Sequence, residues 1–169
     1  GCSWLPQYHD LGLVAMHIAP FAAGHHVVYI SPINFIIAPE LWVVAAARYK
    51  ANHISMPDFG YKFVAKRGAK TVAALRSHKL DLRELKFCHS GAERVRQETC
   101  IEFERLFRGE FCFEAGWVPA YGLAESVLCV SATFRLTCAE KIVCSSARPD
   151  MVCVGEELLV TIRIVDKET

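Results

Sequence analysis

Apolar and polar residues alternate along the first 120 positions in two patterns. Short apolar runs rich in β-branched residues, bounded by Pro, Gly or Asp, predict strands. Longer runs with apolar residues three and four positions apart predict helices. The predicted strands are 27–31, 53–56, 85–89 and 117–120, and the predicted helices are 11–23, 39–49, 58–66 and 96–107. Because strands and helices alternate, the predicted fold class is α/β, a mostly parallel sheet with flanking helices.

The remaining segments predict less regular structure. Residues 31–34, Ser-Pro-Ile-Asn, are typical of a turn. Residues 68–80 are rich in Lys, Arg and small side chains, so we expect an exposed, mobile segment there. From residue 141 onward short strand-like runs follow, the last at 158–165, which predicts a β-rich C-terminal tail. No repeat or low-complexity linker divides the chain, so residues 1–169 are interpreted as one domain.

Composition narrows the class of protein. Apolar residues make up 53% of the chain and charged residues 22%, an apolar balance that predicts surface covered by further chain or a partner. The net charge is +1, with both signs interspersed and no basic stripe, so nucleic acid is not an expected partner. The apolar run 11–23 is too short to cross a membrane, and no secretory signal is recognised, so no transmembrane segment is expected.

Eight cysteines could indicate disulfides or a metal site. They form no CxxC pair and no Cys/His cluster at zinc spacing, and most lie in apolar runs. We therefore predict buried, reduced thiols that pack as small apolar side chains. Reduced thiols indicate a reducing compartment, so we expect a cytoplasmic protein.

Three segments place polar or small residues directly after apolar runs or before a helix. In an open parallel sheet, ligands bind beyond the carboxyl ends of the strands. His9-Asp10 precedes the first helix, residues 90–93 are a Ser-Gly-Ala-Glu loop, and Tyr121 lies four residues before Glu125. An aromatic ring can stack on a base and a carboxylate can bind a hard cation. Taken singly, each segment also fits an ordinary structure: a helix-capping Asp, a tight loop, or a turn with a solvated Glu.

Together and in this order, the segments resemble the motifs of the adenylate-forming superfamily, nearest to the fatty-acyl-AMP ligases. The resemblance rests on 4–13 (WLPQYHDLGL), 31–35 (SPINF), 42–49 (a helix with the family's Trp and Tyr), 90–96 (SGAERVR), 121–125 (YGLAE) and 163–169 (RIVDKET). Enzymes of this family activate a carboxylic acid with ATP and Mg²⁺. The resemblance therefore implies a fatty acid as substrate, an acyl-adenylate as product, and the thiol of an acyl carrier protein as acceptor.

The resemblance also assigns roles to individual residues. The nucleotide site comprises Ser90, Gly91, Ala92 and Glu93 around the adenine and ribose, Tyr121 stacked on adenine, and Gly122, Leu123 and Ala124 beside the α-phosphate. Glu125 holds Mg²⁺ on the phosphates and counts with His9 as catalytic. His9 lies between the acyl pocket and the phosphate, and Asp58, Phe59, Tyr61 and Leu13 line the acyl channel.

Several features depart from the family pattern. Ser90 replaces an Asn, Arg94 replaces a Pro, and the segment between Glu125 and residue 141 is shorter than fatty-acyl-AMP ligases usually carry. The sequence also holds no phosphate loop ending in Pro-Lys-Gly, no ribose motif and no C-terminal catalytic Lys. We therefore expect a central fragment of a layered αβαβα N-terminal domain, inactive alone. The alternatives are a long-chain acyl-CoA synthetase, which uses CoA, and a non-catalytic adenylation-like binding module.

Overall fold

A single mixed sheet organises the chain. The computed structural model describes residues 1–133, 138–144, 146 and 151–157. Within them the strand order is β2-β1-β3-β4-β5-β6-β7, parallel from β2 to β5 and antiparallel from β5 to β7. The strands are β1 (Cys2–Ser3), β2 (Val28–Tyr29), β3 (His53–Met56), β4 (Phe87–Ser90), β5 (Gly116–Gly122), β6 (Cys129–Ala132) and β7 (Glu156–Glu157). The predicted α/β class with a mostly parallel sheet is confirmed.

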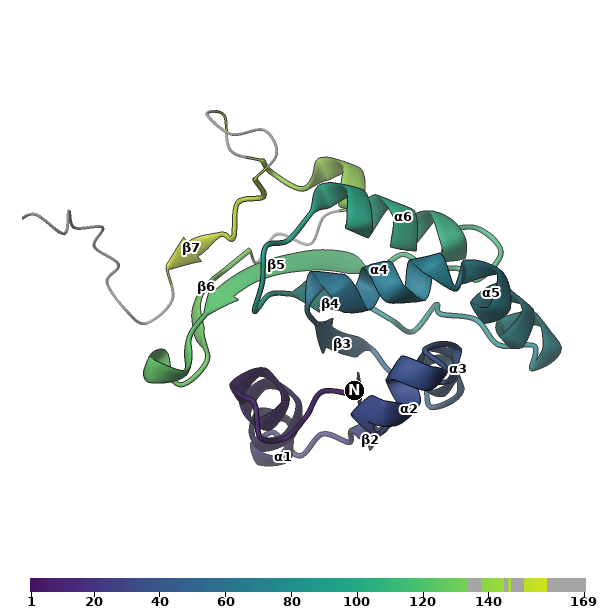
Figure 1. The fold of residues 1–169 in the computed structure, drawn as a ribbon, viewed down its shortest axis with the longest axis horizontal. Helices are drawn as coiled ribbons and strands as arrows, with labels where there is room; N and C mark the ends of the chain where they lie inside the picture. The colour runs from purple at the N-terminus through teal and green to yellow at the C-terminus, as the bar shows by residue number, and fades with distance from the viewer. Residues whose placement is uncertain (134–137, 145, 147–150, 158–169) are drawn as a thin grey trace, which may run out of the picture.

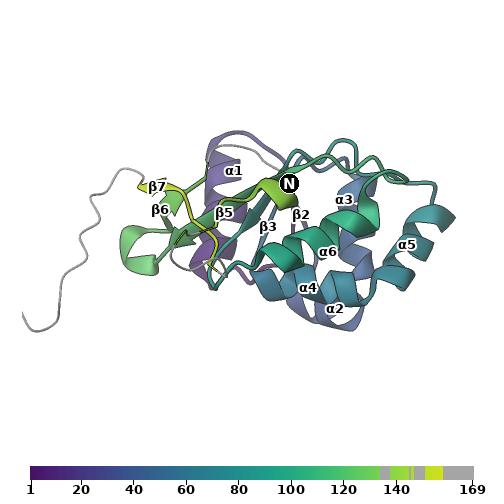
Figure 2. The same cartoon turned by 90° about the horizontal axis from the view of Figure 1, so that it is seen from above.

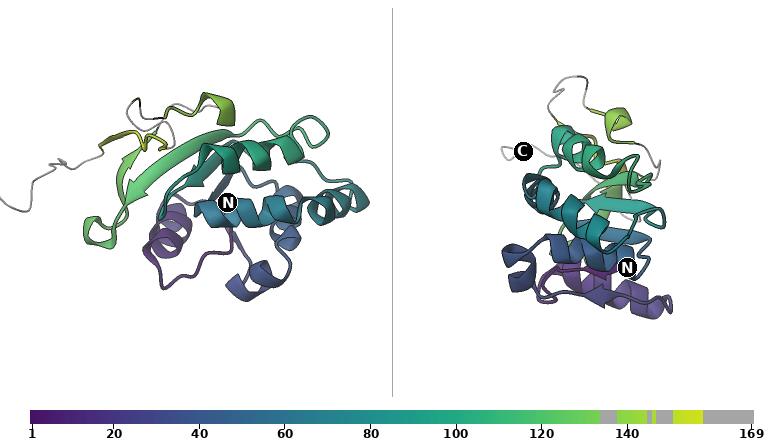
Figure 3. Two further views of the ribbon diagram at one scale, coloured as in Figure 1. Left: turned by 45° about the horizontal axis from the view of Figure 1, so that its top comes forward. Right: turned by 90° about the vertical axis from the view of Figure 1, so that its right-hand side faces the viewer.

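Helices cover both faces of this sheet. They are η1, a π-helix (Leu11–Ile18), α1 (Ala19–Ala22), α2 (Pro32–Ile37), α3 (Glu40–Arg48), α4 (Asp58–Lys66), α5 (Gly68–Ser77) and α6 (Gln97–Phe107), with short 3₁₀ turns η2 (Ala124–Ser126) and η3 (Ala139–Lys141). Seen from above, the sheet lies between the purple η1–α1 helix on one side and α4 and α6 on the other (Figure 2). The β5–β6 ribbon extends beyond the helical body (Figures 1 and 3). The η1–α1 helix therefore covers one face of the sheet, and α4 and α6 cover the other.

A cluster of aromatic rings fills the space between the sheet and α4 and α6. Trp117 on β5 is fully buried and meets Tyr61 and Phe103 edge to face, with ring centroids 4.8 and 5.9 Å apart. Phe107 packs on Phe103 in the same way at 5.0 Å. The indole Nε1–H of Trp117 donates to the Glu104 carboxylate at 3.2 Å, which gives this polar atom a partner inside the core. This cluster fixes β5 against the helices.

Two predictions about irregular segments were wrong. Residues 31–34 form the first turn of helix α2, because the Ser31 hydroxyl accepts the Asn34 N–H at 3.1 Å and Pro32 occupies the first helical position. Residues 68–77 form helix α5, not a mobile segment, and the side chains of Thr71 and Leu75 are completely buried. The Lys and Arg residues that suggested mobility lie on the outer face of this helix.

The cysteine prediction was correct in chemistry and wrong in burial. All eight thiols are free, and Cys2, Cys88 and Cys100 are buried. Cys112 and Cys153 are exposed, however, and the other three are only partly buried. Apolar residues next to a cysteine in the sequence indicate a strand or helix, but they do not indicate on which face of it the thiol lies.

The described part of the tail is sparsely paired. Cys144 forms an isolated antiparallel bridge with Val152, and β7 pairs with β6. The predicted strand 158–165 and the 163–169 motif lie outside the described residues. In the part of the chain that is described, no helix combines the length and apolar composition needed to cross a membrane.

Candidate functional site

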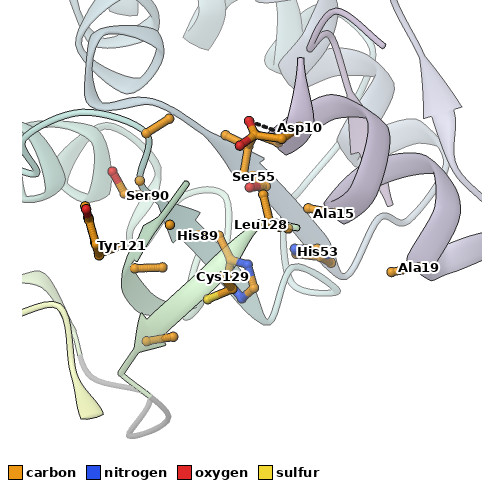
Figure 4. A pocket seen from close by; sticks show the side chains of 16 residues that line it. Asp10, Ala15, Ala19, His53, Ser55, His89, Ser90, Tyr121, Leu128 and Cys129 are labelled. Atoms are coloured by element: carbon orange, nitrogen blue, oxygen red, sulfur yellow. Dashed lines mark hydrogen bonds between the residues drawn. The ribbon is translucent and has the colours of Figure 1, made fainter. Parts of the chain in front are cut away.

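The three segments singled out in the sequence come together around one pocket of about 330 Å³. It lies between η1–α1 and strands β3 to β6 (Figure 4). Its walls include Leu11, Ala15 and Ala19 from the helix and His53, Ser55, His89, Ala120, Leu128, Cys129 and Ala132 from the sheet side. Asp10, Ser90 and Tyr121 each also contribute to the lining, so every predicted segment reaches it. We call this space the first pocket.

Asp10, rather than His9, faces the first pocket. The Asp10 carboxylate accepts the Leu11 N–H at 2.7 Å, which fixes the start of η1. The His9 Nδ1 atom lies 2.6 Å from the same carboxylate, while the His9 side chain is 55% exposed. The structure therefore places His9 at the rim, held by Asp10, with its ring open to solvent.

The loop after β4 is tightly constrained. A Cβ added to Gly91 would lie 2.8 Å from the Ala120 carbonyl oxygen, so only glycine lets β4 and β5 approach this closely. Ala92 adopts φ of +64°, which is uncommon for a non-glycine residue. The Ser90 hydroxyl is buried and has no partner among the described residues. Strained backbone together with an unpaired hydroxyl is typical of a ligand-binding loop.

Asp58 anchors this loop from behind. Its buried carboxylate accepts the Arg96 backbone N–H at 2.8 Å, the Arg96 guanidinium at 2.9 Å and the Thr99 hydroxyl at 3.1 Å. Glu93 reaches back in the opposite direction and accepts the Phe59 N–H at 2.6 Å. The two carboxylates tie the loop 90–96 to the start of α4. Asp58 thus acts within the protein interior, and its side chain does not line the first pocket.

The other residues expected along an acyl channel also lie outside the first pocket. Tyr61 is fully buried, and its hydroxyl donates to the His89 carbonyl at 2.6 Å. Burial raises the pKa of Tyr61 well above its usual value. Phe59 is half exposed and borders a separate hollow beside Phe35 and Lys62, and Leu13 is partly exposed and is not among the residues that line the first pocket. None of these four residues therefore lines the first pocket.

We expect Asp58→Ala to lower the free energy of unfolding by about 3 kcal/mol, because it removes a buried acceptor shared by three donors. Urea denaturation of wild type and variant measures the difference. Asp81→Ala is the matched control, since Asp81 pairs with Arg83 at the surface and should cost less than about 1 kcal/mol. Equal losses in the two variants would show that Asp58 does not anchor the loop.

β5 is longer than predicted and carries Tyr121 and Gly122 within the strand. Its register to β6 shifts between these two residues, which marks a bulge. A Cβ on Gly122 would lie 1.7 Å from the Leu128 carbonyl oxygen, so the chain requires glycine there. The bulge leaves the Tyr121 side chain half exposed. An aromatic ring is thereby presented at the strand end, where parallel sheets bind ligands.

A second pocket, of about 430 Å³, lies on the other side of this strand end. Its further walls are Glu93, Arg94, Val95, Met151, Val152 and Val154. Ala92, Ala120, Tyr121 and Gly122 line both pockets and form a shared wall. The two pockets are therefore adjacent at Tyr121–Gly122.

Glu125 is the candidate ligand for Mg²⁺. It lies on η2 directly after the shared wall, and its side chain is exposed. No group of three or more His, Cys, Asp and Glu side chains is close enough to hold a metal ion by itself in the described residues. Mg²⁺ is often bound through one or two carboxylates together with substrate phosphates, and a single exposed carboxylate fits that mode. Leu123 and Ala124 complete the segment without lining either pocket.

Two histidines of the first pocket were not predicted from the sequence. His53 lies on β3 and His89 on β4, with ring centroids 4.7 Å apart. The pKa of His53 is lowered to about 3, mainly by burial and to a smaller extent by the neighbouring His89. Burial also lowers the pKa of His89. The sequence does carry a signal for them, because both histidines lie in otherwise apolar strands, where a polar side chain is unusual.

Comparisons with known proteins show the family to which the chain belongs. Residues 2–169 match the AMP-binding enzyme family. The chain is 38% identical over 129 residues to the medium-chain-fatty-acid–[acyl-carrier-protein] ligase JamA of Moorena producens, covering 76% of this chain and 21% of the relative. It is 34% identical over 171 residues to the long-chain-fatty-acid–AMP ligase FadD32 of Mycolicibacterium smegmatis, covering 98% of this chain and 25% of the relative.

A solved structure matches the fold as well. It is a fatty acyl-adenylate ligase from L. pneumophila in complex with acyl adenylate and pyrophosphate, with a TM-score of 0.70 and 35% identity. The match covers 78% of this chain and 22% of that chain. The chain thus spans about a quarter of the length of the relatives it matches.

Proposed function

The chain belongs to the AMP-binding enzyme family, and we propose that the full-length protein activates a medium- or long-chain fatty acid with ATP to an acyl-adenylate and transfers the acyl group to an acyl carrier protein. The observation that carries this proposal is the wall shared by the two pockets. An acyl-adenylate has an apolar chain and a nucleoside joined through one phosphate. Two adjoining pockets with a common wall fit such a molecule.

The acyl chain occupies the first pocket, whose walls are mainly Ala, Leu and strand backbone. The adenosine occupies the second pocket, where Tyr121 offers its ring face to the base. The carboxyl–phosphate junction then lies at Ala120–Gly122, because these residues line both pockets. His9 lies at the rim of the first pocket with its ring exposed, and we assign it to the phosphates from the family motif at 4–13.

The reaction forms one bond and breaks one. An oxygen of the fatty acid carboxylate attacks the α-phosphorus of ATP, and the bond to the bridging oxygen of pyrophosphate breaks. The chain's own residues orient the two reactants and exclude water. In phosphoryl-type transfers, this positioning supplies most of the rate acceleration. Mg²⁺, held through Glu125, neutralises phosphate charge when it is bound. The full site also requires the family's phosphate loop and catalytic lysine.

We expect Tyr121→Ala to raise the KM for ATP about tenfold, because base stacking on an aromatic ring is worth about 1–3 kcal/mol. Tyr121→Phe keeps the ring face and should restore most of the affinity. Steady-state pyrophosphate release by the full-length protein measures both variants. Tyr49→Ala, which removes an exposed ring far from the shared wall, is the control. A KM for ATP unchanged in Tyr121→Ala would remove the stacking role.

The acceptor is proposed from the relatives, because JamA is named as a ligase for an acyl carrier protein. The second candidate is CoA, favoured by the short segment that follows Glu125. Offering the full-length protein fatty acid, ATP and either acceptor, and identifying the thioester by mass spectrometry, separates the two. We place the reaction in the cytoplasm, which the eight free thiols support.

A further inference from the structure

Two imidazoles form part of the wall of the first pocket. His53 and His89 come from neighbouring parallel strands, and their rings meet edge to face at 4.7 Å and 65°. Figure 4 shows both side chains in the space between η1–α1 and the sheet, alongside Leu128 and Cys129. The part of the wall formed by His53 and His89 is therefore polar, although the rest of the lining suits a plain hydrocarbon chain.

Polar atoms of the residues in this wall lack hydrogen-bond partners. Three buried side-chain atoms lack a partner in the described part of the chain, and two of them, His53 Nε2 and Ser90 Oγ, belong to residues that line this pocket. A buried polar atom without a partner is destabilising, and native proteins keep few of them. Because both residues line the first pocket, an occupant with polar groups of its own would give these atoms partners.

The chemistry of the wall restricts what that group is. Burial lowers the pKa of both imidazoles, so at neutral pH the two rings are uncharged. The charged side chain of the lining is Asp10, and it is already engaged by His9 and the Leu11 N–H. A carboxylate or ammonium group on the ligand would lose its hydration without gaining an opposite charge. A hydroxyl fits, because it both donates and accepts and so pairs with either tautomer of a neutral imidazole.

We propose that the acid activated at this site is a hydroxylated fatty acid, whose chain hydroxyl bonds to His53 Nε2 beside His89. This inference rests on the proposed function, since it names the substrate class of the same site. His53 is then a specificity-determining residue. A saturated acid of equal length fills the same space but leaves the imidazole unpaired, so the site discriminates against it.

The test compares a saturated acid with its isomers hydroxylated at successive carbons, using the full-length protein. We expect at least one isomer to show kcat/KM for adenylate formation at least about tenfold above that of the saturated acid. His53→Leu should bring this ratio close to one, and His53→Gln, which keeps a hydrogen-bonding group, should retain part of it. Leu128→Ile alters the same wall without altering its polarity and should keep the ratio. If His53→Leu does not fold, the comparison of the saturated acid with its hydroxylated isomers on the wild-type protein is by itself the test of the inference.

A parallel calorimetric titration of the same acids separates this inference from the proposed function. If adenylates form but the saturated acid reacts as well as every isomer, the inference is overturned and fatty acid activation stands. If no acid is adenylated but a hydroxylated isomer binds at least about tenfold more tightly, the proposed function fails and the hydroxyl site stands. If no acid reacts and none binds preferentially, both are wrong.

Discussion

Replacing Glu125 with alanine is expected to slow acyl-adenylate formation by the full-length protein about 100-fold or more. Glu125 lies on η2, directly after the wall shared by the two pockets, and the proposed function puts the phosphates of ATP at that wall. It offers the carboxylate that fits Mg²⁺ there, and loss of one charge-stabilising group at a reacting centre typically costs a factor of 10²–10³. Single-turnover formation of acyl-AMP is the measurement, because it reports the adenylation step alone.

The control for this variant is Glu114→Ala. Glu114 is also exposed, but it lies in the turn before β5, away from both pockets. It should leave the rate within about twofold of wild type, since an isolated surface carboxylate contributes little. A Glu125→Ala protein that forms acyl-AMP as fast as Glu114→Ala would remove Glu125 from the metal role.

Gly122→Ala is expected to disrupt both the site and the fold around it. The new Cβ would lie 1.7 Å from the Leu128 carbonyl oxygen, and that atom belongs to the backbone and cannot rotate away. β6 must move, which separates it from the bulge in β5 and shifts the wall shared by the pockets. We expect a loss of about 3 kcal/mol or more in unfolding free energy and a similarly severe loss of adenylation.

Gly109→Ala separates this steric effect from a general effect of losing glycine. Gly109 has φ of +82°, but no atom lies within 4 Å of an added Cβ. Its substitution should cost only about 1–2 kcal/mol of backbone strain and leave adenylation kinetics intact. Chemical denaturation and acyl-AMP formation should be measured on both variants. Equal effects in the two would contradict the close approach of β5 and β6.

The sequence predicted those elements whose signal is local. Strand 53–56 and helix 58–66 are found within the predicted bounds, because an apolar run, a proline and an amphipathic repeat coincide there. Residues 31–34 were ambiguous, since Ser-Pro begins a helix as readily as a turn. The outcome there is associated with a contact remote in sequence: Phe35 stacks on Trp4 with ring centroids 4.0 Å apart. β1 has only two residues and no recognisable pattern.

For the site, too, local features could be predicted from the sequence and contacts between remote residues could not. The motif at 121–125 was visible in the sequence, and its order with the loop after β4 suggested one pocket. Register is not visible in this way, and it is register that sets His53 diagonally across from His89. Nor could sequence separate Asp58 from the pocket, because its partners Arg96 and Thr99 lie at the start of another helix, α6. Residues that act together through strand pairing or helix contact require the structure.

The most direct test of the central claim is acid-dependent exchange of pyrophosphate into ATP, catalysed by the full-length protein. We predict exchange that depends on a medium- or long-chain fatty acid, with acyl-AMP detected by mass spectrometry in the same reaction. Exchange that is absent with every fatty acid offered, in a folded protein that binds an acyl-AMP analogue, would contradict the claim and identify a binding module instead.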